Sequence, residues 1–156
     1  MDVQYINPFL EGTLHVLKTM AFIEARPGKP FLKKDNSAKG DITGIIGLAG
    51  AVRGSFALSF TESCILRIVS NMLGEEITQV NGDIEDAVGE LTNMVSGAAR
   101  QRLEAMGYSV SAAIPTVVTG KGHTVNHVLG GASIIIPFET DYGAFVADVC
   151  MKKVEE

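Results

Sequence analysis

The stretch GDITGIIGLAGAVRGSFALSF, residues 40–60, contains two runs rich in Ile, Leu, Val and Phe, joined by small residues at 49–51. Two β-forming runs on either side of a short glycine-containing link are typical of a hairpin. We therefore predict antiparallel strands at residues 40–48 and 52–60. Neither a phosphate-binding nor a dinucleotide-binding pattern follows the glycines of this stretch, so they indicate bulges or close backbone packing. They are Gly44, Gly47, Gly50 and Gly54.

Helix signals lie on both sides of this hairpin. The first predicted helix covers residues 7–22, with Asn7 as its N-cap and Pro8 in its first turn. The longest runs from Asp83, its predicted N-cap, to a closing glycine at Gly107. A shorter helix between them is bounded by a hydroxyl cap and a closing glycine: Thr61 or Ser63 at its start, and Gly74 after Leu73.

Further strand signals follow the longest helix. Residues 108–119 alternate weakly and are interrupted by Pro115, while residues 132–139 and 144–152 form a second predicted pair. Antiparallel pairs with short turns, and helices gathered on one face, indicate the α+β class. We predict one domain over residues 1–156, with a largely antiparallel sheet of about six strands and long helices packed on one face.

Composition excludes several functions. The 156 residues are 46% hydrophobic with a net charge of −5, and no basic cluster or interleaved aromatic residues suggest nucleic-acid binding. The lysines from Lys29 to Lys39 indicate a solvated hairpin or loop. No apolar run approaches the roughly 20 residues that span a bilayer, and the start lacks a secretory signal, so we expect no membrane insertion and a cytoplasmic location. Cys64 and Cys150 are expected to be buried free thiols.

Histidines offer a weaker signal. His123 and His127 stand four positions apart, a spacing that on a helix could hold a metal. They lie within residues 120–131, which are rich in glycine and lack a helical pattern, so we predict an exposed turn or strand edge there and no metal site. His15 lies on the first predicted helix and is expected to be a boundary residue rather than a catalyst.

The longest helix has an unusual polar face. With 100° per residue, Asp86, Glu90, Asn93 and Gly97 share one side, together with Gln101 and Glu104. The opposite side carries the apolar residues predicted for the core: Ile84, Val88, Leu91, Val95 and Met106.

Glu90 and Asn93 therefore point outward, with β-carbons about 5–6 Å apart. An ordinary solvated face alternates Lys, Arg and Glu, whereas this one includes Gly97 and is flanked by Gly89 and Ser96. Small residues beside polar ones allow another backbone or a bulky ligand to approach. An ordinary surface with Glu and Asn remains the alternative interpretation.

The spacing Asp86-x-x-x-Glu90-x-x-Asn93, followed by Pro115, resembles the signature of the CheC/CheX/FliY family of bacterial chemotaxis phosphatases. Three other segments are similar to the family as well, and the chain most resembles the CheX branch. These segments are NPFLEGTLHVLKTM (7–20), GSFALSF (54–60) and MLGEE (72–76).

This resemblance implies removal of phosphate from the aspartyl phosphate of a response-regulator receiver domain such as CheY. The receiver supplies Mg²⁺, a Lys and a Thr or Ser, so we expect no metal or cofactor on this chain. Asn93 would orient the attacking water and Glu90 would pair with the receiver's Lys. Asp86 and Gly97 would help to bind the receiver, and the resemblance also implies a homodimer.

One departure from the family pattern concerns the first helix. In the CheC branch both halves carry a motif, but here Glu11-Gly12-Thr13-Leu14 has Leu where Asn would be needed. An alkyl side chain cannot orient water, so we expect one active face per chain. Two alternatives to the phosphatase are a non-catalytic adapter that binds receivers and a dimerisation module.

Overall fold

The computed structural model describes residues 3–33, 39–124 and 133–154. After a 3₁₀ turn at Val3–Tyr5, its helices are α1 (Ile6–Ala21), α2 (Glu62–Leu73) and α3 (Gly82–Ala105). The strands, in chain order, are β1 (Arg26–Pro27), β2 (Phe31–Leu32), β3 (Lys39–Gly50), β4 (Val52–Phe60), β5 (Val110–Ala112), β6 (Thr116–Thr124), β7 (Ile134–Thr140) and β8 (Gly143–Lys153).

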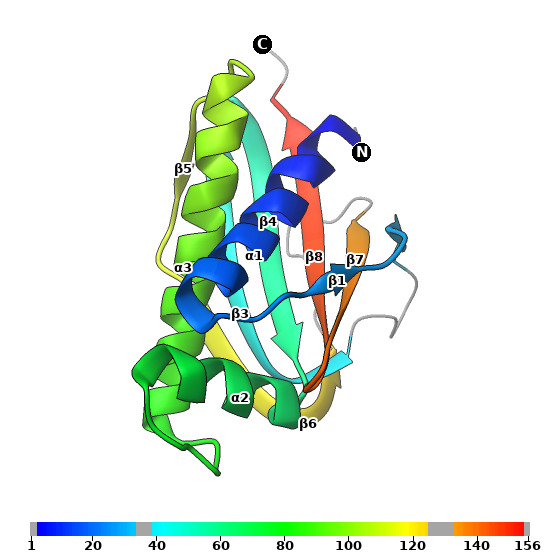
Figure 1. The fold of residues 1–156 in the computed structure, drawn as a ribbon. Helices are drawn as coiled ribbons and strands as arrows, with labels where there is room; N and C mark the ends of the chain where they lie inside the picture. The colour runs from blue at the N-terminus through cyan, green and yellow to red at the C-terminus, as the bar shows by residue number, and fades with distance from the viewer. Residues whose placement is uncertain (1–2, 34–38, 125–132, 155–156) are drawn as a thin grey trace.

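The strands form one sheet in the order β1-β7-β8-β4-β3-β5, with β2 beside β7 and β6 beside β3. Every strand pair among the described residues is antiparallel. Helices α1 and α3 lie across one face of this sheet, and α2 lies near the end where β4 finishes (Figure 1). The α+β class is therefore confirmed.

The sheet has eight strands rather than about six, because two very short strands were not predicted. β1 and β2 are exposed and have two residues each, too few for any alternation to be visible in the sequence. Both pair with β7, and β2 lies in the segment from Lys29 to Lys39 whose lysines suggested a solvated hairpin or loop. The predicted interruption at Pro115 is confirmed, since β5 ends at Ala112 and β6 begins at Thr116.

Two predicted helix caps are wrong. The N-cap of α1 is Tyr5, and Asn7 lies inside the helix, because the 3₁₀ turn before α1 lets the chain enter it earlier. The N-cap of α3 is Asn81 rather than Asp83: the Ile84 amide donates to Asn81 Oδ1 at 3.1 Å. Asp83 lies instead in the first turn, where its charge favours the positive end of the helix.

The start of α2 is capped from a distant strand. Thr61 is the N-cap residue, as predicted, but its hydroxyl donates to the Ala144 carbonyl (3.1 Å). The Glu62 amide donates to Asp41 Oδ2 (2.9 Å), and the Gly122 amide donates to the other oxygen of Asp41 (3.2 Å). One carboxylate thus connects α2 and β6 to β3. Gly74 closes α2 with φ 69°, as predicted.

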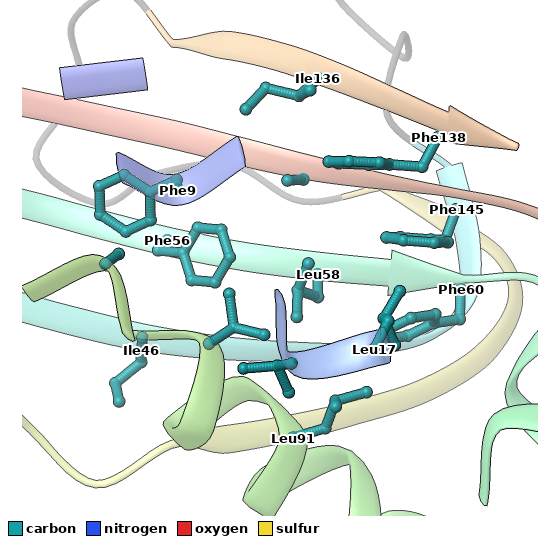
Figure 2. Packing of buried hydrophobic residues seen from close by; sticks show 14 of the residues in the cluster. Phe9, Leu17, Ile46, Phe56, Leu58, Phe60, Leu91, Ile136, Phe138 and Phe145 are labelled. Atoms are coloured by element: carbon teal, nitrogen blue, oxygen red, sulfur yellow. The ribbon is translucent and has the colours of Figure 1, made fainter. Parts of the chain in front are cut away.

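The core lies between the helices and the sheet face that they cover (Figure 2). Phe9 of α1 contacts Phe56 of β4 with ring centroids 4.8 Å apart. At the other end, Phe138 of β7 stacks on Phe145 of β8, also at 4.8 Å. Leu91 of α3 is fully buried in the same cluster. Side chains of both long helices are therefore fixed by the core.

Both predicted free thiols are buried. Burial raises the pKa of Cys64 to about 11, because the thiolate would lose its solvation, and burial likewise raises the pKa of Cys150. Both side chains are therefore protonated near neutral pH. Among the described residues, no helix combines the length and the apolar character that a membrane span requires.

Helix α3 approaches β3 closely at Gly44. A β-carbon on Gly44 would overlap Thr92 Oγ1 and would lie 3.0 Å from Thr92 Cβ and 3.3 Å from Val88 Cγ1. The Thr92 hydroxyl is held there, since it donates to the Val88 carbonyl at 2.7 Å. Close backbone packing, one of the two roles expected for the hairpin glycines, is thus confirmed at this position.

Gly44→Ala is predicted to lower the free energy of unfolding by about 1–3 kcal/mol, because an overpacked contact forces α3 away from the sheet. Gly47→Ala is the matched control on the same strand, since a β-carbon there would meet only Ala113 Cβ, at 3.9 Å. Urea denaturation of both variants measures the difference. Equal stability of the two variants would contradict the close packing of α3 against β3 at Gly44.

Candidate functional site

Helix α3 presents Glu90 and Asn93 to solvent, as predicted. The helix orients them by burying its other side: Ile84, Val88, Leu91 and Val95 are fully buried. Met106, also predicted for the core, is 43% exposed because α3 has ended before it. Glu90 and Asn93 are one helical turn apart, so their β-carbons lie about 5–6 Å from each other.

The neighbours of this pair are small or distant. Asp86 is exposed one turn earlier, and Gly97 is partly exposed one turn later. A β-carbon on Gly97 would meet only the guanidinium of Arg100, at 3.8 Å. On one flank, buried Gly89 faces β6, since its β-carbon would lie 3.5 Å from Val117 Cγ2. The structure therefore brings Asp86, Glu90, Asn93 and Gly97 onto one face, with little bulk on it.

Two further residues on the same flank carry unusual polar atoms. Ser96 is completely buried, whereas the sequence placed it only beside the exposed face. Its Oγ and the Nε of Arg100 are buried with no hydrogen-bond partner among the described residues. Arg100 was not predicted as a site residue, although its position seven residues after Asn93 places it almost directly above that residue on the helix.

The first helix lacks a second site of this kind. Glu11 of α1 lies 3.4 Å from Arg102 Nε of α3, so its carboxylate forms an ion pair between the helices. Gly12 packs tightly against α3, where a β-carbon would lie 3.2 Å from the Ala99 nitrogen. Leu14 packs against the core. This segment therefore joins α1 to α3, in agreement with its missing Asn.

His15 and His123 are the two histidines that the structure describes. His123 lies in β6, where its Nδ1 donates to the Gly120 carbonyl (2.6 Å) and its Nε2 lies 2.5 Å from Thr43 Oγ1. The strand-edge alternative thus holds for residues 120–124, while His127 lies outside the described residues. His15 is exposed on α1. Within the described part of the chain, no group of three or more His, Cys, Asp or Glu could hold a metal ion.

Two hollows in the described surface, of about 490 and 360 Å³, lie beside α2, and no residue of α3 lines either one. The Glu90–Asn93 pair projects instead from an exposed helix face. Such a face suits contact with another macromolecule better than enclosure of a small molecule.

Comparisons with known proteins agree on one family. The family model described as chemotaxis phosphatase CheX matches residues 42–139 of this chain. The CheY-P phosphatase CheX of Thermotoga maritima is 31% identical over 122 residues, which are 78% of this chain and 79% of that protein.

Solved structures extend the similarity to the whole fold. A CheC-like superfamily protein from Shewanella sp. PV-4 is 48% identical, with a TM-score of 0.91 over 97% of this chain and 99% of that one. A CheX–CheY–BeF₃–Mg²⁺ complex from Borrelia burgdorferi matches with a TM-score of 0.82 at 25% identity, over 97% of this chain and 100% of that one. The family model, the curated relative and these folds lead to one conclusion: this chain belongs to the CheX family of chemotaxis phosphatases.

Proposed function

We propose that this chain, acting as a single domain, is a phosphatase that hydrolyses the aspartyl phosphate of a CheY-like response regulator. The observation that carries the proposal is the exposed pair Glu90 and Asn93 on one bare face of α3. Family membership supports it, as does the Thermotoga relative, which is named a CheY-P phosphatase. The Borrelia complex supports the partner, because there a CheX protein binds CheY with BeF₃, a mimic of the phosphoryl group.

This chain needs to supply only a few of the groups that the hydrolysis requires. In the hydrolysis, the oxygen of water forms a bond to phosphorus while the bond from phosphorus to the aspartyl oxygen breaks, which releases inorganic phosphate and the carboxylate. Mg²⁺ belongs to the receiver and neutralises charge on the phosphoryl oxygens there. Asn93 can accept a hydrogen bond from the water and donate one to a neighbouring oxygen. It thereby holds the water in line with the bond that breaks.

The remaining residues of the face bind the receiver. The carboxylate of Glu90 pairs with a receiver lysine and sets the register of α3 across the phosphorylation site. Asp86 adds a weaker polar contact one turn away. Gly97 leaves space for the receiver backbone, since only Arg100 lies near the place where a side chain would be.

Asn93→Ala is predicted to lower the rate of receiver dephosphorylation about 100-fold or more, because the water loses its orientation. The measurement is the decay of ³²P-labelled receiver domains from the same genome. Binding of the BeF₃–Mg²⁺ form of the receiver should survive. Gln101→Ala is the matched control, since it removes another exposed carboxamide from the same face of α3. Wild-type activity of Asn93→Ala would refute the role given to Asn93.

Glu90→Ala is predicted to weaken binding of the same receiver by about 10-fold or more, because a charge-assisted contact is lost. Isothermal titration with the BeF₃–Mg²⁺ receiver measures the dissociation constant. Glu104→Ala serves as control, because it removes an exposed carboxylate more than three turns farther along α3. If the two variants bind alike, Glu90 makes no such contact.

The adapter alternative requires tight binding without hydrolysis. Unchanged decay of every receiver, despite binding of one of them, would establish it. The intact Glu90–Asn93 pair favours the phosphatase, because an adapter has no use for a carboxamide that orients water.

The homodimer that the family resemblance implies is also part of the proposal. We expect a molecular mass in solution of twice that of the monomer, measured by light scattering. Asn93→Arg should leave this mass unchanged, because the α3 face is kept for the receiver. Conversion to a monomer by Asn93→Arg would favour the third alternative, a dimerisation module that buries this face.

A further inference from the structure

Arg100 lies on α3 in line with the proposed catalytic pair. It follows Asn93 by seven residues, which is about 10 Å along the helix axis and only about 20° around it. It is also next to Gly97, the bare position of the same face. A cation is therefore placed beside the receiver-binding face.

One atom of the Arg100 guanidinium, Nε, is unusual in being buried with no hydrogen-bond partner among the described residues. Arg102 is a useful contrast, because it donates to the Ala98 carbonyl (3.0 Å) and pairs with Glu11 (3.4 Å). The Nε atom is covered by the chain itself, but Arg100 as a whole is only partly buried. An acceptor on a partner would therefore meet the Nη end of the guanidinium, which lies near Gly97.

The position of this guanidinium is known from its neighbour. A β-carbon on Gly97 would lie 3.8 Å from Arg100 Nη2, with no other atom within 4 Å. The side chain therefore leans back along α3 toward Gly97 and Asn93, as helical side chains do. Its charge reaches the edge of the Glu90–Asn93 face.

An exposed apolar residue, Ile114, lies on a segment that neighbours α3. Ile114 is 89% exposed on the link between β5 and β6, which runs beside α3 (Figure 1). Val117, three residues later, faces Gly89. With about 3.3 Å per residue in the strand and 1.5 Å in the helix, Ile114 is about level with residues 94–97 of α3. Gly89 and Arg100 are on the same flank of α3, about 20° apart around its axis.

We propose that Arg100 and Ile114 form a second docking contact for the receiver, in which Arg100 pairs with a surface carboxylate and Ile114 packs against apolar surface beside it. This inference rests on the proposed function. The guanidinium of Arg100 complements a carboxylate on the receiver surface about 10 Å from the phosphorylation site, because Arg100 lies about that far along α3 from Asn93. Contact at Glu90 and at Arg100 together fixes the angle of α3 on the receiver.

The test compares binding with catalysis. The dissociation constant of the BeF₃–Mg²⁺ receiver and the single-turnover rate at saturating protein are measured for Arg100→Ala, Arg100→Lys, Ile114→Ser and the control Arg102→Ala. Arg100→Ala should weaken binding about 10-fold, with a smaller dependence on salt, and keep the saturated rate. Arg100→Lys should restore part of the affinity, and Arg102→Ala should bind like wild type. Ile114→Ser should weaken binding about threefold or more, and its exposure makes misfolding a poor explanation.

Other outcomes separate the two proposals. A lower saturated rate with Arg100→Ala would mean that its charge acts on the phosphoryl group, which overturns the docking contact. Wild-type binding by both Arg100→Ala and Ile114→Ser also overturns it, while loss of activity in Asn93→Ala would still support the proposed function. If a receiver is bound but not hydrolysed, the proposed function fails, and the binding measurements still decide the role of Arg100. If wild-type protein binds no receiver, both proposals fail.

Discussion

The close approach of α3 to β3 at Gly44 is the constraint on which the rest of the structure depends. Because position 44 has no side chain, the hydroxyl of Thr92 occupies that space and the helix lies directly on the sheet. Gly12 allows a second, less extreme close contact between α1 and α3, where a β-carbon would lie 3.2 Å from the Ala99 nitrogen. Because α3 packs closely against a glycine of β3 on one side and a glycine of α1 on another, it has little freedom to rotate or slide. Its third side is thereby presented to solvent in a fixed orientation.

A fixed orientation matters because the proposed reaction draws most of its chemistry from the partner. A carboxamide and a carboxylate on an open face are weak catalysts by themselves. Placed against a site that already contains Mg²⁺ and a phosphoryl group, they need only be in the right position. The small residues Gly89 and Gly97 keep the face narrow, and the buried apolar side keeps it rigid. Rigidity of the fold and modest side-chain chemistry are thus two parts of one arrangement.

Much of this could be predicted from the sequence. The hairpin at residues 40–60 follows from two runs of β-forming residues around a short link, and the outward position of Glu90 and Asn93 follows from the helical periodicity of their segment. The helix starts were harder, because Asn81 and Asp83 are both good caps, and Thr61 gives its hydroxyl to Ala144 while Asp41 caps α2 from another strand. Strands of two residues leave no pattern at all. Whether the Nε of Arg100 has a partner depends on packing, so the sequence shows where the residue lies but not that this atom lacks an acceptor in the described part of the chain.

The glycines of α3 have one more consequence, for attempts to transfer the pair to another setting. Gly89 and Gly97 each cost a free helix about 1 kcal/mol relative to alanine, and short helices are marginal in water even without them. Residues 82–105 made as a peptide would therefore be mostly unfolded, with Glu90 and Asn93 in no fixed relation. The smallest unit that can be grafted includes β3 and α1, whose own glycines receive the helix. A design that transfers this site would need to copy the packing of α3 against β3 and α1 as well as its exposed face.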